Sequence, residues 1–287
     1  MKAIELNNIR KTFGARLALD VETLAIDGGR MVAVIGPSGA GKSTLMRHIS
    51  GLVTSDRGTR GSIRVHDELI QSNGRLSRSI RRLRAEIGVV FQQFNLVGRL
   101  TLLQNVLIGT LSRTPFYRRW SRSFTHAEKC EAMRALDFVG MSEFAAQRAS
   151  TLSGGQQQRG AVARAIVQRA RVVLADEPIA SLDPESARVV MQRLRDMNQS
   201  DGVTVLVSVH QIDYASRYCD DVVAMRDGRI LDVCPADRLD LDKLKAIYGE
   251  RFEAMQAEYL APAPVRADEA ASADELKHLD IEARLND

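Results

Sequence analysis

Short apolar runs are separated by longer segments with helical periodicity along most of this chain. Residues 31–35 and 172–175 contain only Met, Val, Ala, Ile and Leu, and residues 87–91 and 203–209 are nearly as apolar. Runs of this length and composition are typical of parallel strands that are buried on both faces. Because these strands alternate with helical patterns, we expect an α/β domain with a mainly parallel sheet.

A different kind of strand is indicated near the start of the chain. In residues 4–9 and 17–26, apolar side chains recur at every second position for much of the segment. This spacing predicts an antiparallel layer of strands placed before the first buried run. A further strand is expected at residues 63–65, and Asp-Gly at 227–228 between two apolar segments predicts a β-hairpin.

Helical periodicity dominates the middle of the chain. The pattern is helical over residues 100–150, and we assign an inserted helical subdomain to about residues 96–160, which is too long for a loop. Another helix is expected after Asp183, which can cap it, with Pro184 at its first position. Residues 75–84 predict a third helix, with arginines covering the faces around one apolar stripe. That stripe consists of Leu76, Ile80 and Leu83.

Composition narrows the class of protein only slightly. The net charge of +4 allows an anionic surface as a neighbour but identifies none. Apolar runs stay well short of the roughly 20 residues of a membrane-spanning helix, and residues 1–5 lack the apolar core of a signal peptide. Three widely separated cysteines predict no disulfide framework, and they fit a reducing compartment.

The stretch around which the chain is organised follows the first buried run. Residues 36–44 read Gly-Pro-Ser-Gly-Ala-Gly-Lys-Ser-Thr and fit the phosphate-binding pattern G-x-x-x-x-G-K-[ST]. Glycines let such a loop turn its N–H groups toward a phosphate, and the helix that follows adds partial positive charge. Lys42 is expected to bind the outer phosphates, and the Ser43 hydroxyl to ligate Mg²⁺. The strand before the loop and the helical spacing after it favour this interpretation over an ordinary glycine-rich turn.

Two adjacent carboxylates end the second buried run. Asp176 follows residues 172–175 directly, and parallel strands carry their ligand groups at their C-terminal ends. Asp176 is therefore expected to hold Mg²⁺, directly or through water. Glu177 is placed to orient or deprotonate an attacking water. Alone, this pair would indicate a solvated acidic turn; beside a phosphate loop, the catalytic interpretation is favoured.

A second helix start suited to anions lies at residues 152–159, which read Leu-Ser-Gly-Gly-Gln-Gln-Gln-Arg. One nucleotide does not need two such loops from one chain. We therefore expect this second loop to serve a nucleotide that is held by another copy of the chain.

These motifs, in this order, resemble those of the ATP-binding-cassette (ABC) family. Residues 36–43 resemble its Walker A motif, residues 152–156 its signature motif and residues 172–176 its Walker B motif. The resemblance covers about residues 3–248 and makes Glu177 the catalytic glutamate. The other matched positions are the adenine-stacking aromatic Phe13, the Q-loop glutamine Gln92, the D-loop aspartate Asp183 and the switch histidine His210.

The resemblance implies a fold and a set of ligands. The fold is a P-loop NTPase (RecA-like) core with a mainly parallel sheet, an antiparallel β layer and the inserted helical subdomain. The ligands are ATP and Mg²⁺. The implied ATP-binding residues are Phe13, Gly36, Pro37, Ser38, Gly39, Ala40, Gly41, Lys42, Ser43 and Thr44. The implied metal ligands are Ser43, Gln92 and Asp176, and the implied catalytic residues are Glu177, His210 and Gln92.

The resemblance also implies a dimer. Two cassettes meet head to tail, so that each ATP lies between the Walker A motif of one copy and the signature motif of the other. The signature residues concerned are Ser153, Gly154, Gly155 and Gln156. Closure on ATP and opening after hydrolysis would drive a partner. We expect the cassette to occupy residues 1–249, and the tail at 250–287, rich in Ala, Pro and acidic residues, to be mobile.

Three segments further resemble the ATP-binding subunits of phosphonate importers. They are residues 91–97, residues 178–187 and the run Gln-Ile-Asp-Tyr-Ala after His210, whereas Gly160 departs from the larger residue usual in relatives. This resemblance implies a location on the cytoplasmic face of the inner membrane. It also implies an integral membrane permease as partner and, indirectly, a periplasmic phosphonate-binding protein. The solute rests on resemblance alone, because a cassette need not touch it.

Alternative functions agree with the sequence to different degrees. A soluble cassette acting on a cytosolic carbon–phosphorus lyase complex stays open as the alternative. A DNA-repair cassette would insert a long coiled coil, and no heptad run exists here. Arginine clusters at residues 75–84 and 113–122 allow either a solvated face or a surface near anionic lipids. No nucleic-acid motif accompanies them, so we expect no nucleic-acid partner.

Overall fold

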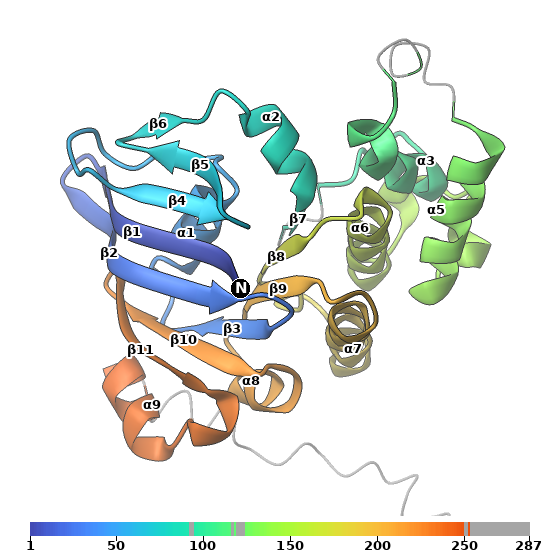
Figure 1. Cartoon of the computed structure of the whole chain (residues 1–287). Helices are drawn as coiled ribbons and strands as arrows, with labels where there is room; N and C mark the ends of the chain where they lie inside the picture. The colour runs from blue at the N-terminus through green and yellow to red at the C-terminus, as the bar shows by residue number, and fades with distance from the viewer. Residues whose placement is uncertain (92–94, 116–117, 119–123, 250–251, 253–287) are drawn as a thin grey trace, which may run out of the picture. The chain divides into compact units, whose positions relative to one another are not determined.

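Two sheets form the centre of the fold (Figure 1). The computed structural model describes residues 1–91, 95–115, 118, 124–249 and 252. The first compact unit runs from Met1 to Gly249. Apart from Phe252, the predicted tail lies outside the described residues.

The larger sheet is mainly parallel, as predicted. Its strands are β3 (Met31–Ile35), β7 (Ile87–Val90), β8 (Val172–Asp176), β9 (Thr204–Ser208), β10 (Asp221–Arg226) and β11 (Arg229–Pro235), in the order β11-β10-β3-β9-β8-β7. Neighbouring strands are parallel except for the predicted β10–β11 hairpin. Every residue of β3, β8 and β9 is buried, which explains their apolar sequences.

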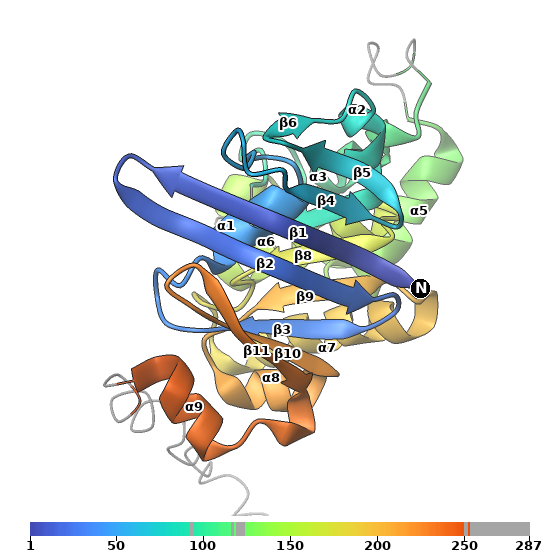
Figure 2. The same cartoon turned by 60° about the vertical axis from the view of Figure 1, so that its left-hand side comes forward.

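The smaller sheet is antiparallel and includes the predicted layer at the start of the chain. Its strands are β1 (Lys2–Phe13), β2 (Arg16–Asp27), β4 (Ser62–Val65), β5 (Glu68–Ser72) and β6 (Arg75–Leu76), in the order β2-β1-β4-β5-β6. Figure 2 looks onto the long β1–β2 hairpin, with β4 beside β1. Buried side chains of this layer, such as Ile4 and Val21, share one hydrophobic core with Val34 of the larger sheet.

Helices flank the sheets and build the inserted subdomain. They are α1 (Lys42–Ile49), α2 (Ile80–Leu83), α3 (Leu102–Leu107), α5 (His126–Phe138), α6 (Gly154–Gln168), α7 (Pro184–Asp201), α8 (Ile212–Tyr218) and α9 (Leu241–Tyr248). The helices α3, α5 and α6 pack against one another on the right of Figure 1. In the part of the chain that the structure describes, no helix combines the length and apolar character needed to cross a membrane.

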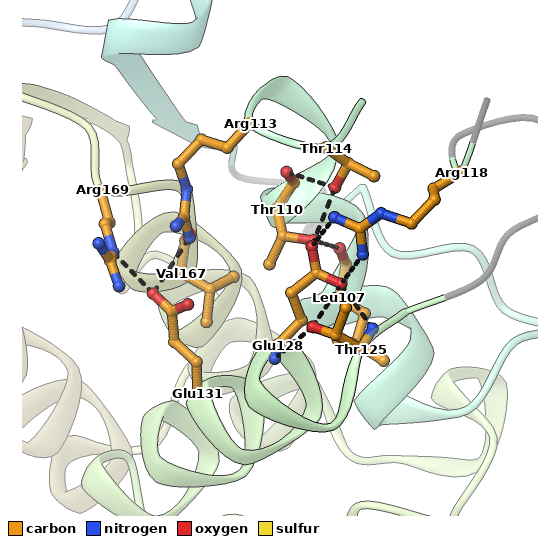
Figure 3. Close-up of polar contacts among 10 residues, drawn as sticks. All are labelled: Leu107, Thr110, Arg113, Thr114, Arg118, Thr125, Glu128, Glu131, Val167 and Arg169. Carbon is orange, nitrogen blue, oxygen red and sulfur yellow. Dashed lines mark hydrogen bonds and ion pairs between the residues drawn. The ribbon is translucent and has the colours of Figure 1, made fainter. Parts of the chain in front are cut away.

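Polar contacts join the arginine-rich segment after α3 to α5 and α6 (Figure 3). Arg118 donates to both carboxylate oxygens of Glu128, at 3.0 and 3.2 Å. Arg113 donates to Glu131 at 3.1 Å and to the carbonyl of Val167 near the end of α6. These two arginines are therefore held in ion pairs within the helical part, and Arg119 and Arg122 of the same cluster lie outside the described residues.

The helix predicted over residues 75–84 is wrong. Arg75 and Leu76 form β6, which pairs with β5, and only the four residues of α2 are helical. Asn73 and Gly74 have positive φ values of 51° and 71°, and these favour a tight turn between β5 and β6. The hairpin leaves Leu76 37% exposed, although the helical pattern would have buried it. The Asn-Gly turn, which is itself a local hairpin signal, here outweighs the helical periodicity of the segment.

Candidate functional site

The C-terminal ends of three parallel strands bring the predicted residues together. The loop at residues 36–41 joins β3 to α1, Asp176 ends β8, and Ser208 ends β9. In the register of the sheet, Ser208 lies opposite both Asp176 and Val34. The phosphate loop and the two carboxylates therefore lie at one edge of the sheet, where α/β proteins bind ligands.

A cavity of about 510 Å³ lies over this loop, within the 300–1,000 Å³ range of small-molecule sites. It is lined by Phe13, Arg16, Ala18, Ser38, Gly39, Ala40, Gly41, Lys42, Ser43, Thr44, Glu177 and His210. Arg16 and Ala18 were not predicted as site residues. They come from β2, opposite the end of β1 that carries Phe13, and nothing in their local sequence marks them as ligand-binding residues.

Two loop positions can hold only glycine without displacing neighbouring backbone. Gly36 has a φ of 146°, and a Cβ atom there would lie 2.1 Å from the Met225 carbonyl oxygen. Gly41 has a φ of 102°, and its Cβ atom would lie 2.8 Å from the Ala18 carbonyl oxygen. The tight loop thus packs against β10 and β2 because the glycines have no side chains.

Lys42 lies folded onto the loop. Its Nζ donates to the carbonyl oxygens of Gly36 at 2.8 Å and Pro37 at 3.3 Å, and the residue is only 4% exposed. Burial lowers the pKa of Lys42, while the nearby charges of Glu177 and Asp176 oppose that shift. The ammonium group is therefore already largely desolvated, at the start of α1, where a phosphate would be attracted.

Asp176 is the centre of a small hydrogen-bond network. Its Oδ1 accepts from the hydroxyl of Ser43 and from the hydroxyl of Ser208, each at 2.9 Å. The backbone N–H of Glu177 donates to the Ser208 hydroxyl at 2.8 Å. Ser43 and Asp176 were predicted to lie together and do so, whereas Ser208 was not predicted.

Glu177 and His210 form the second polar pair of the cavity. The Nε2 of His210 lies 2.6 Å from Oε1 of Glu177, and their side chains are 30% and 17% exposed. An ionised carboxylate only accepts hydrogen bonds, so Nε2 is the donor. This hydrogen bond lowers the pKa of Glu177, with help from the charges of His210 and Lys42, while burial opposes the shift.

The signature residues lie elsewhere in the same chain. Ser153 caps α6: its hydroxyl accepts from the N–H of Gln156 at 3.3 Å, and its own N–H donates to Oε1 of Gln156 at 2.9 Å. Among the described residues that line the cavity, none belongs to the signature segment 153–156. The second helix start therefore contributes nothing to the phosphate-loop cavity of its own chain.

Of the other described residues that were predicted, Asp183 lies outside the cavity lining, and Gly36, Pro37 and Asp176 lie next to lining residues in the chain without being part of the lining. Asp183 is exposed and caps α7, accepting from the N–H of Ser186 at 3.0 Å, as predicted from its sequence. Gln92 lies outside the described residues.

The oxygen atoms of Ser43 and Asp176 suit a magnesium ion. The Ser43 hydroxyl donates to Oδ1 of Asp176 at 2.9 Å, and Ser43 lines the cavity beside the phosphate loop. Mg²⁺ prefers oxygen ligands and is commonly held by one or two protein groups together with phosphate oxygens. Across the residues that the structure describes, no cluster of three or more His, Cys, Asp or Glu offers an all-protein metal site.

Known proteins are similar to this chain in sequence and in fold. The ABC transporter family matches residues 19–180. The phosphonates import ATP-binding proteins PhnC of Shigella sonnei (strain Ss046) and Escherichia coli (strain K12) are each 53% identical to the chain over 245 residues. That alignment covers 85% of this chain and 94% of each relative.

Solved structures agree in architecture. A dimeric ATP-binding cassette in a post-hydrolysis state, bound to ADP and Pi, has a TM-score of 0.71 and 31% identity. The match covers 81% of this chain and 98% of that one. A nucleotide-free cassette from an ABC transporter has a TM-score of 0.70 and 25% identity, covering 86% and 95%.

These matches confirm the predicted fold class, that of a P-loop NTPase with an antiparallel layer and inserted helices. The family match contains the phosphate loop, the signature segment and both carboxylates. The chain therefore belongs to the ABC transporter family and is one of its ATP-binding cassettes.

Proposed function

We propose that this chain is the ATP-hydrolysing subunit of a membrane importer for phosphonates. The observation that carries the proposal is the 53% identity to phosphonates import ATP-binding proteins over 94% of their length. That alignment spans most of this chain, and the site geometry supplies the chemistry that such a subunit needs. The subunit works on the cytoplasmic face of the inner membrane, together with a permease and, indirectly, a periplasmic phosphonate-binding protein.

ATP binds over the phosphate loop. The ring of Phe13 is 52% exposed at the cavity and stacks on the adenine. Lys42 exchanges its hydrogen bonds with the Gly36 and Pro37 carbonyls for the β- and γ-phosphates, which are stronger acceptors. Because the lysine is already desolvated, little is lost when it makes this exchange.

Ser43 and Asp176 hold Mg²⁺, with Gln92 as a further ligand that lies outside the described residues. When bound, the ion neutralises charge that builds up on the phosphates during transfer. Glu177 orients the attacking water and accepts its proton, and the lowered pKa of Glu177 keeps the carboxylate ionised for this role. His210 holds the carboxylate in place through the 2.6 Å contact.

A second copy completes each site. Ser153 is exposed at the start of α6 and has backbone N–H groups of the first turn behind it, but it does not line its own chain's cavity. In a head-to-tail dimer, Ser153, Gly154, Gly155 and Gln156 face the γ-phosphate held by the partner. Asp183 lies at the same interface.

A groove of about 420 Å³ between the core and the helical part receives the permease. Leu52, Ile87, Val89 and Ile108 give it an apolar floor, and Leu52 is 50% exposed. A partly apolar groove with a polar rim is the usual anatomy of a docking surface. Phe91 lies in the groove one residue before Gln92, which connects nucleotide and permease.

Gene deletion and co-purification test this proposal. A deletion strain should fail to grow on a phosphonate as sole phosphorus source, yet grow normally on inorganic phosphate. The wild-type gene should restore growth, and the Glu177→Gln variant should not. Normal growth of the deletion strain, with no second importer present, would refute the phosphonate assignment. Co-purification with a soluble carbon–phosphorus lyase complex in place of a membrane protein would favour the alternative function.

A further inference from the structure

We propose that Ser208 is a positioning residue for ATP hydrolysis, which holds Glu177 in register with Asp176 and His210. The inference rests on the proposed roles of Asp176 and Glu177. It adds a residue that contacts neither ATP nor the attacking water, and whose effect on catalysis passes through Glu177.

The hydroxyl of Ser208 is the link between the ends of two strands. Its Oγ donates to Oδ1 of Asp176 at 2.9 Å and accepts from the N–H of Glu177 at 2.8 Å. Ser208 is fully buried, and its register partner in the sheet is Asp176. One small side chain therefore fixes both the metal-binding carboxylate and the backbone of the next residue.

The backbone of Glu177 needs such a restraint. Its φ of 49° lies in the left-handed region, which side-chain-bearing residues seldom occupy. Conformations of this kind persist when the surroundings hold them in place. The hydrogen bond from the Glu177 N–H to the Ser208 hydroxyl restrains this backbone conformation, in which the Glu177 carboxylate contacts His210.

The same link sets the distance between Glu177 and His210. Glu177 follows β8 directly, and His210 lies two residues beyond the end of β9. The 2.6 Å contact between their side chains therefore depends on how the ends of these two strands are held together. The Ser208 hydroxyl joins the two ends at this point.

The neighbours of Ser208 show that burial alone does not demand a hydroxyl here. Val205, Leu206 and Val207 precede it in β9 and are as buried as Ser208 itself. An apolar residue would satisfy packing equally well, but it would leave the N–H of Glu177 without its acceptor. Unsatisfied buried donors are rare in folded proteins, so the hydroxyl has a specific purpose.

The test compares the loss of two buried hydroxyls from the same strand. Ser208→Ala removes the link, and Ser208→Thr keeps a hydroxyl. Thr204→Val is the matched control, because Thr204 is equally buried in β9 and accepts from the N–H of Gly29 at 3.0 Å, at the other end of the strand. ATPase kinetics, affinity for a fluorescent ATP analogue in EDTA and thermal unfolding are measured for each.

We expect kcat of Ser208→Ala to fall about tenfold, which corresponds to about 1.4 kcal/mol. KM and the affinity for the analogue without Mg²⁺ should change less than about twofold, because the lost interaction acts at the transition state. Ser208→Thr should keep most of the wild-type kcat. Thr204→Val should lower the unfolding temperature about as much as Ser208→Ala, while its kcat stays close to that of wild type.

A double-variant cycle separates positioning from general destabilisation. If Ser208 acts through Glu177, adding Ser208→Ala to Glu177→Gln should cost almost nothing further in single-turnover hydrolysis. A full additional tenfold loss in that background would overturn the proposal. So would a wild-type kcat for Ser208→Ala, or an equal loss of kcat in Thr204→Val.

A second variant tests the proposal if Ser208→Ala does not fold. Ser208→Cys keeps the volume but donates weakly, and it should show the same loss of kcat at unchanged analogue affinity. Wild-type kcat in a folded Ser208→Cys protein would overturn the proposal. A wrong phosphonate assignment would give a different result. The deletion strain would then grow normally on a phosphonate, while the purified wild-type protein would still hydrolyse ATP.

Discussion

The Nε2 of His210 lies 2.6 Å from Oε1 of Glu177, although the two residues are 33 positions apart and follow different strands. The carboxylate is thereby oriented and kept ionised beside the phosphate loop. Five predictions rest on this contact and on three other features. These are the folded-back Lys42, the cavity lining without signature residues, and the close packing of Gly36 against β10.

Glu177→Gln should bind ATP but hydrolyse it at least about 100-fold more slowly, because the amide keeps the shape and cannot accept a proton. The variant should accumulate as an ATP-bound dimer in size-exclusion chromatography. Glu185→Gln is the control, since Glu185 is exposed and pairs with Arg188 at 2.7 Å. A Glu177→Gln protein with near-normal turnover would contradict the assigned role.

The stability of the nucleotide-free protein should depend on pH through Glu177. Its pKa is lowered in the folded state, chiefly by the hydrogen bond from His210, so ionised Glu177 stabilises the fold above its unfolded-state pKa. That contribution is lost as the pH falls through the folded-state pKa. The difference in unfolding free energy between wild type and Glu177→Gln should therefore narrow below about pH 4.3. Urea titrations at several pH values measure it, and a constant difference would count against the pairing.

Lys42→Ala should lose ATP affinity without losing stability. Hydrogen bonds to charged groups contribute about 1.5–3 kcal/mol, so affinity should fall roughly 10- to 150-fold, and turnover with it. Burial disfavours the charged lysine in the empty site, so the unfolding free energy without nucleotide should stay level or rise. Lys2→Ala, which removes an exposed ion pair, serves as the control for both measurements. Wild-type turnover in Lys42→Ala would rule out the phosphate-loop assignment.

A mixture of two inactive variants should regain activity if the signature segment serves the partner's nucleotide. Lys42→Ala and Ser153→Arg chains each lack both sites as homodimers, but their heterodimer has one intact composite site. In an equal mixture, about a quarter of the wild-type number of sites should be intact. ATPase assays before and after mixing measure the gain. No gain at all would mean either that the sites belong to single chains or that both must fire together. A covalently linked dimer with both substitutions in one chain distinguishes these, because its wild-type chain keeps an intact site only if each site belongs to a single chain.

Gly36→Ala should destabilise the fold by about 3 kcal/mol or more, because its Cβ would lie 2.1 Å from the Met225 carbonyl oxygen in a strained backbone. Gly58→Ala is the matched control: Gly58 has a φ of 91°, but an added Cβ would meet nothing within 4 Å. Gly58→Ala should lower the unfolding free energy only through backbone strain, by about 1–2 kcal/mol. Equal unfolding free energies for the two variants would argue against the close approach of β10 to the loop.

Features whose physical cause is local could be predicted from the amino-acid sequence. The loop at residues 36–44 follows from glycine conformations and a helix start that adjacent residues encode, and the buried strands β3 and β8 follow from the apolar runs 31–35 and 172–175. The cap of α7 by Asp183 is equally local. Each of these could be predicted because the interacting groups lie within a few residues of one another.

Contacts between segments that are separated in the sequence could not be predicted in this way. Glu128 and Glu131 engage Arg118 and Arg113, which the sequence showed only as part of a basic cluster. The β5–β6 hairpin is different, because the local signal Asn73-Gly74 marks it and the helical stripe at residues 75–84 hid that signal. Arg16 and Ser208 joined the site because the β1–β2 hairpin and the register of β9 place them there. No local pattern marks Arg16 or Ser208 as site residues, because the groups they meet there belong to other segments that are brought together by packing of the sheets.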